Sequence, residues 1–263
     1  MTTTAVGALH AYVPSDSWLM CVLRGSIYSV PLMGILLAHE MGHYLNGRRF
    51  GLDLTPPYFI PGVPPFGTFG AFIKIRSPLY DRNVLIRVGA WGPIAGSFIA
   101  IPALALGLYL SEAKAGTPVS EGFSFGTSII LELFCLIRFG EFSSQLNVLM
   151  HPVALAAWFG LLVTAVNLLP IGQLDGGHVI YSLFGPRWAR RISIATFCAL
   201  VPLGIALCEA WLGFAVVVFI VGLKHPPPLD PVTPLDRNGR ILGYAAIVLF
   251  VLTFIPVPIT FMQ

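Results

Sequence analysis

Long apolar stretches, separated by short polar or glycine- and proline-rich segments, dominate this sequence. A helix needs about 20 consecutive apolar residues to cross the hydrocarbon core of a bilayer. The pattern therefore predicts an all-α membrane protein, a polytopic bundle of about six transmembrane helices. The predicted spans cover residues 26–45, 87–110, 152–169, 192–207, 210–223 and 241–257. Residues 192–223 are too long for one crossing, so we expect a turn around Cys208–Trp211.

The composition supports a membrane location. Of the 263 residues, 56% are hydrophobic and only 10% are charged, with a mean hydropathy of +0.82. Soluble domains carry about 25% charged residues. The net charge of +3 is small and is not gathered into a stripe, so we expect no nucleic-acid partner. The four cysteines stand singly in apolar stretches, which predicts small hydrophobic side chains rather than disulfides.

The basic residues favour the six-span interpretation. If the first span ends in the cytoplasm and the spans alternate, twelve Lys and Arg residues lie inside and three outside. The inner residues are Arg48, Arg49, Lys74, Arg76, Arg82, Arg87, Arg187, Arg190, Arg191, Lys224, Arg237 and Arg240; the outer ones are Arg24, Lys114 and Arg138. Without the turn at Cys208–Trp211 the ratio falls to nine against six, a weaker positive-inside bias. We expect a single multi-pass domain over residues 1–263, with no cleavable signal peptide.

The pentapeptide His39-Glu40-Met41-Gly42-His43 matches the pattern H-E-x-x-H. On a helix, two histidines four residues apart share one face and can bind one zinc ion. Glu40 lies beside them, where it can take a proton from the water that zinc activates. Ionisable side chains within a membrane span are expensive and usually functional. The alternative is a buried cluster of His and Glu that only packs the bundle.

A third metal ligand is expected elsewhere, because catalytic zinc commonly has three protein ligands and one open position. Asp175 follows a span that Pro170 ends, and Gly176-Gly177 frees the backbone beside it. The alternative is that Asp175 caps a helix starting near Gly177. Asp175 and the histidines both precede basic segments on the same side of the predicted membrane, which favours one shared metal centre.

The two motifs together resemble the site-2 protease family of intramembrane metalloproteases. H-E-M-G-H lies in the first span and N-L-L-P-I-G-Q-L-D-G-G spans residues 167–177. The resemblance covers about residues 30–224 and is to the compact type, without a PDZ or nucleotide-sensing domain. It implies one Zn²⁺ per chain on His39, His43 and Asp175, with Glu40 as general base. It also implies that Asn167 lies near the substrate or the tetrahedral intermediate; a hydrogen bond between helices is the alternative.

The segment of residues 58–76 resembles the family's re-entrant β-loop after the first span. Around Phe69, Gly70 and Ala71 it is rich in β-formers, and a free strand edge there could hold an unwound substrate by strand addition. An amphipathic surface hairpin is the alternative.

Three further expectations concern residues outside the two motifs. We expect His178 to orient Asp175 by a hydrogen bond, or simply to cap a helix or face water. We take His225 for an ordinary interfacial residue. The G-x-x-x-G spacing of Gly92 and Gly96 predicts close helix packing, and residues 126–139 have helical spacing.

The sequence thus favours a zinc metalloendopeptidase that cleaves transmembrane protein substrates within the lipid bilayer. We expect it in a bacterial cytoplasmic membrane, or an organellar one, with its active site toward the cytoplasmic side. The alternative is a divalent-metal-binding membrane transporter or an inactive protease-like scaffold. Neither the substrate nor the oligomeric state follows from the sequence.

Overall fold

The computed structural model describes residues 2–10, 17–62, 67–114, 122–143 and 146–262, and this part of the chain is predominantly helical. Its helices are α1 (Thr2–His10), α2 (Trp18–Arg49), α3 (Arg82–Tyr109), α4 (Ile129–Phe139), α5 (Pro152–Asn167), α6 (Asp175–Ala206), α7 (Ala210–Val221) and α8 (Arg237–Thr253). The expected helical class is therefore confirmed, and α4 lies where helical spacing was predicted. Helix α1 was not predicted.

Within the described residues, three helices, α2, α3 and α6, are long and apolar enough to cross a membrane. Helices α5 and α7 are shorter apolar helices. Large apolar side chains are exposed on the outside of the bundle, including Phe98 on α3 (82% exposed) and Ile220 on α7 (77%). A water-soluble protein rarely leaves so many large apolar side chains exposed. These helices therefore support a membrane protein.

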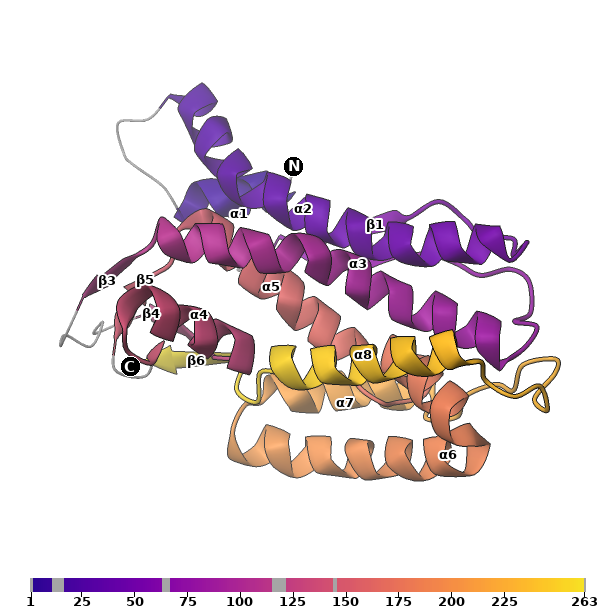
Figure 1. Ribbon diagram of the computed structural model, residues 1–263. Coiled ribbons are helices and arrows are strands. Elements are labelled where there is room, and N and C mark those ends of the chain that lie inside the picture. The colour runs from indigo at the N-terminus through magenta and orange to yellow at the C-terminus, as the bar shows by residue number, and fades with distance from the viewer. Residues whose placement is uncertain (1, 11–16, 63–66, 115–121, 144–145, 263) are drawn as a thin grey trace.

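Helices α2, α3 and α5 form the main core, with α2 and α3 running side by side (Figure 1). Their contact surface is filled by fully buried side chains such as Ile35, Leu104 and Trp158. Small residues allow close approach: a Cβ atom at Gly42 would overlap the backbone of Trp91 on α3. The predicted close packing at Gly92 and Gly96 is confirmed, since both face histidines of α2.

Helix α6 bends at Gly185, where φ is +81° and Pro186 follows. A positive φ favours glycine, and proline starts the next helical stretch without needing a hydrogen-bond donor. The predicted span 192–207 lies within this second helical stretch. The predicted turn is confirmed, since α6 ends at Ala206 and α7 begins at Ala210.

In the part of the chain that the structure describes, three small antiparallel strand pairs accompany the helices. Strands β1 (Tyr58–Pro61) and β2 (Thr68–Phe72) form the hairpin expected after the first span, and its tip at residues 63–66 lies outside the described residues. The other pairs join β3 (Glu112–Lys114) to β5 (Asn147–Leu149), and β4 (Gly122–Phe125) to β6 (Ile259–Met262). These two pairs were not predicted, because their strands are short and their partners distant in sequence.

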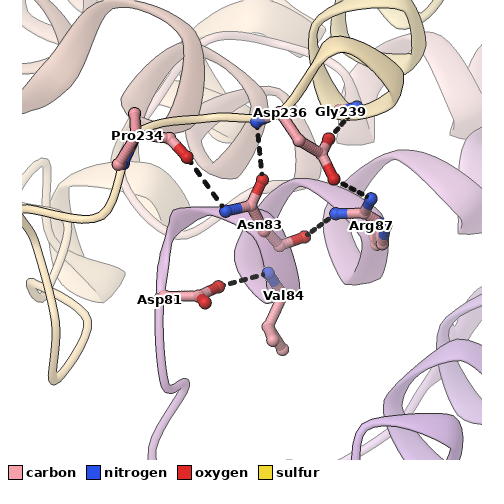
Figure 2. A network of polar contacts seen from close by, with 7 residues as sticks. All are labelled: Asp81, Asn83, Val84, Arg87, Pro234, Asp236 and Gly239. Atoms are coloured by element: carbon pink, nitrogen blue, oxygen red, sulfur yellow. Dashed lines mark hydrogen bonds and ion pairs between the residues drawn. The ribbon is translucent and has the colours of Figure 1, made fainter.

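A polar network joins the start of α3 to the start of α8 (Figure 2). The Asn83 amide donates to the carbonyl oxygen of Pro234 (3.2 Å) and accepts from the backbone N–H of Asp236 (2.9 Å). Asp236 also pairs with Arg87 (2.5 Å) and caps α8 by accepting from the N–H of Gly239 (2.6 Å). The segment before α8 is thus fastened to α3.

Candidate metal centre

The histidines of the first motif lie on one face of α2, toward α3. His39 and Glu40 are buried, and the rings of His39 and His43 are 5.0 Å apart. Glycines on α3 leave space for these rings: a Cβ at Gly92 would overlap the His43 ring, and one at Gly96 would come within 3.1 Å of His39. The sequence indicated these glycines as packing residues, but not that they accommodate the histidines.

Asp175, which is 135 residues beyond Glu40 in the chain, meets both histidines. Its Oδ2 atom lies 3.3 Å from Nε2 of His39 and 3.3 Å from Nε2 of His43. Two ligand atoms bound at about 2.05 Å to a tetrahedral zinc ion lie about 3.3 Å apart. The three residues form the one cluster in the described chain whose His, Cys or carboxylate ligand atoms all lie within 4.8 Å. The donor set and spacing fit a zinc ion.

A hydrogen bond orients the His43 ring for this role. Its Nδ1 lies 2.7 Å from the carbonyl oxygen of Val88 on α3. Because a carbonyl oxygen only accepts, Nδ1 carries a proton, so in the neutral ring Nε2 has the lone pair that a metal ion needs. An outer partner of this kind fixes the tautomer and orientation of a metal-binding histidine.

The turn before α6 determines where Asp175 lies. Gly172 has a φ of +51°, and a Cβ at Gly176 or Gly177 would overlap the backbone of this turn. Glycine is therefore needed where the chain folds back on itself. The N-cap of α6 is Leu174 and Asp175 is the first helical residue, so the helix-cap interpretation of Asp175 was wrong.

Asn167, the last residue of α5, also reaches the cluster. Its Nδ2 atom lies 3.3 Å from Nε2 of His39. The sequence placed Asn167 near the site only through the family resemblance; in the structure its side chain lies beside His39 of the cluster.

His178 contacts a different residue from the one we expected. Its Nδ1 is 2.6 Å from Nε2 of His225, which lies after α7, whereas we expected a hydrogen bond to Asp175. The ring of His225 stacks on Tyr181 at 4.5 Å. These contacts of His225 were not predicted. No local sequence pattern indicates this pair, because its members are 47 residues apart.

A cavity of about 220 Å³ lies at the cluster. It is lined by His39, Glu40, His43, Leu54, Ala71, Phe72, Ile73, Ile75, Val88, Asn167, Gln173, Leu174, Asp175 and His178. Strand β2 and the residues after it thus form one wall, including Ala71. Gly70 is buried in the same strand with a φ of +108°, and the side chain of Phe69 lies outside the described residues.

Comparison with known proteins agrees with this geometry. The model of peptidase family M50 matches residues 27–210, more than half of the chain, and includes both motifs. The chain is 32% identical over 233 residues to "Probable zinc metalloprotease EGY1, chloroplastic" of Arabidopsis thaliana, covering 86% of this chain and 42% of that protein. It is 31% identical over 241 residues to "Probable zinc metalloprotease EGY2, chloroplastic" of Oryza sativa subsp. japonica, covering 90% of this chain and 43% of that protein.

A shorter match joins the chain to the "DDT domain-containing protein PTM" of Arabidopsis thaliana, at 33% identity over 143 residues and 8% of that protein. The chain spans less than half the length of the metalloprotease relatives named above. The matched family is the one that the two motifs indicated. Because the family model matches more than half of the chain, the chain belongs to peptidase family M50.

Proposed function

We propose that this chain is an intramembrane zinc metalloendopeptidase that cleaves peptide bonds in or near transmembrane segments of membrane-anchored proteins. The observation that carries the proposal is the meeting of His39, His43 and Asp175 in one cavity with Glu40. Membership of a peptidase family supports an enzyme over a transporter or an inactive scaffold.

His39, His43 and Asp175 would hold one zinc ion per chain. When bound, zinc polarises a substrate carbonyl and lowers the pKa of water toward neutrality. Glu40 then acts as general base and afterwards returns the proton to the leaving amine. Its carboxyl group suits this role because it lines the cavity yet is 5% exposed, so bulk water competes little for the proton.

Strand β2 would hold the substrate. In the described sheet β2 pairs only with β1, which leaves its second edge without a strand partner. A transmembrane substrate must unwind before its peptide bonds are accessible, and the backbone at Phe69, Gly70 and Ala71 could bind the unwound segment as an added strand. The Asn167 amide, 3.3 Å from His39, could donate to the substrate or to the developing oxyanion.

The six-span arrangement is also part of the proposal. Helices α5 and α8 have 16 and 17 residues and would cross a thin bilayer with their flanking residues. Helix α7 has 12 residues, about 18 Å at 1.5 Å per residue, so the predicted span 210–223 would need its flanking residues and a thinner bilayer to cross ~30 Å of hydrocarbon.

We further propose that the metal centre faces the side of the membrane that bears most arginines and lysines, the cytoplasmic side in a bacterium. The names of the plant relatives make an organellar membrane the alternative location.

The test is cleavage of a membrane-anchored reporter by the purified chain in liposomes. Glu40→Gln should abolish cleavage while zinc content stays at one per chain, since Gln keeps the shape of Glu but cannot take the proton. Glu209→Gln, at the N-cap of α7, is the matched control and should cleave normally. Undiminished cleavage by Glu40→Gln would refute the proposed role of Glu40.

A further inference from the structure

The loop between α7 and α8 (residues 222–236, hereafter the α7–α8 loop) holds the turn that precedes Asp175. Ser193 on α6 forms the connection: its hydroxyl accepts from the backbone N–H of Gly172 (3.1 Å) and donates to the carbonyl oxygen of Leu223 (3.0 Å). Ser193 is 3% exposed. The backbones also touch, since a Cβ at Gly172 would overlap the carbonyl oxygen of Gly222.

His225 makes a second connection from the same loop, and its proton positions follow from the geometry. Its Nδ1 lies 2.6 Å from the carbonyl oxygen of Pro226, so Nδ1 carries the proton. Neutral His225 therefore has a lone pair on Nε2, which accepts from Nδ1–H of His178 at 2.6 Å. His178 lies one helical turn beyond Asp175, so this hydrogen bond holds the first turn of α6.

The far end of the α7–α8 loop is fastened to the start of α3. The backbone N–H groups of Leu229 and Asp230 donate to the carbonyl oxygens of Leu79 (3.0 Å) and Tyr80 (2.7 Å). The network of Figure 2 continues the attachment through Asp236. Helix α3 carries the Val88 carbonyl that orients His43. The α7–α8 loop therefore connects α3, which orients His43, with the turn that precedes Asp175.

A cavity of about 130 Å³ lies between the turn and this loop, lined in part by Gly172, Tyr181, Ser193, Leu223 and His225. The turn is therefore not fixed on this side by close packing alone. Ser193 and His225, which make the hydrogen bonds described above, both line this cavity.

We propose that the α7–α8 loop sets the position of Asp175 relative to the two histidines, and that His225 and Ser193 are positioning residues for metal binding. The inference rests on the proposed metal site. Losing outer partners of a metal site commonly weakens metal binding about 10- to 100-fold.

The test is the zinc dissociation constant of the full chain in detergent, measured by competition with a chelating indicator. His225→Phe keeps a ring to stack on Tyr181 but loses the acceptor for His178, and Ser193→Ala loses the bridging hydroxyl. Both should raise the constant about 10-fold or more. His225→Gln restores an acceptor near the position of Nε2. Its zinc dissociation constant should therefore lie within about twofold of the wild-type value, because the hydrogen bond to His178 is restored.

Thr253→Ala is the matched control. It removes a hydroxyl that is equally buried but bonds only within α8, to the carbonyl oxygen of Leu249 (2.8 Å). Its zinc affinity should be unchanged. Wild-type affinity in both His225→Phe and Ser193→Ala would overturn the inference, as would equal weakening in Thr253→Ala. His43→Ala separates failure of this inference from failure of the proposed metal site. If His43→Ala binds zinc as tightly as wild type, the proposed metal site itself is wrong.

Discussion

Gly92→Ala is the substitution whose effect the structure predicts most directly. The added Cβ would overlap the Nε2, Cε1 and Cδ2 atoms of His43. Non-bonded carbon atoms need about 3.5–4.0 Å, so the ring would have to move by roughly 1 Å or more. It cannot do so and keep both the hydrogen bond to Val88 and its position beside Asp175.

The effect on stability should be small beside the effect on metal binding. Overpacking a well-packed site costs about 1–3 kcal/mol, while Ala regains about 1 kcal/mol over Gly in a helix interior. The net loss is therefore about 0–2 kcal/mol, and the protein should still fold. Metal-ligand distances tolerate only about ±0.2 Å, so zinc affinity should fall at least about 100-fold, the upper end of the range for a disturbed outer partner.

The assay is chelator competition for zinc, with helicity followed by circular dichroism in the same detergent. Gly34→Ala is the control. Gly34 lies on the same helix as the histidines, and a Cβ added there would meet no atom within 4 Å. We expect it to bind zinc normally. If Gly92→Ala retains wild-type zinc affinity, then His43 in its observed position is not a metal ligand and the reasoning fails.

Three smaller predictions concern stability. The Ser97 hydroxyl is buried and has no hydrogen-bond partner in the described part of the chain; Ser97→Ala should therefore raise the melting temperature or leave it unchanged, and a clear decrease would show an overlooked partner. Arg87→Gln should destabilise the protein by only about 0.2–1 kcal/mol, since Asp236 is half exposed. Arg87 and the Gly239 N–H hold the pKa of Asp236 below its usual range. The contribution of the Asp236 carboxylate to the free energy of unfolding should thus be complete above about pH 4 and be lost as the pH falls through the lowered pKa. Urea unfolding of wild type and Asp236→Asn across this range would measure this contribution. A difference in unfolding free energy between the two proteins that widens on acidification would contradict the prediction.

The sequence predicted the elements whose signal is local and repetitive. Apolar runs identified α2, α3, α5 and the turn before α7, and the spacing of His39 and His43 placed both on one helical face. Asp175 could be predicted as a third ligand because its motif and the charge distribution placed it on the same side of the membrane as the two histidines. Contacts that depend on how distant segments pack could not be predicted from the sequence.

The contacts that sequence reasoning missed have no local signal. Nothing near His225 indicates that its ring meets His178, since the α7–α8 loop is polar and rich in proline like many surface loops. The paired strands β4 and β6 lie more than 130 residues apart in sequence, and each is only four residues long. Only tertiary packing brings such segments together.

The central claim is that His39, His43 and Asp175 form a zinc site, and zinc K-edge X-ray absorption on the purified chain tests it most directly. We predict one zinc per chain with a first shell of nitrogen and oxygen only, at about 2.0–2.2 Å, including two imidazoles. Asp175→Ala should lower the coordination or release the metal. A sulfur shell at about 2.3 Å, or a spectrum that Asp175→Ala leaves unchanged, would contradict the account.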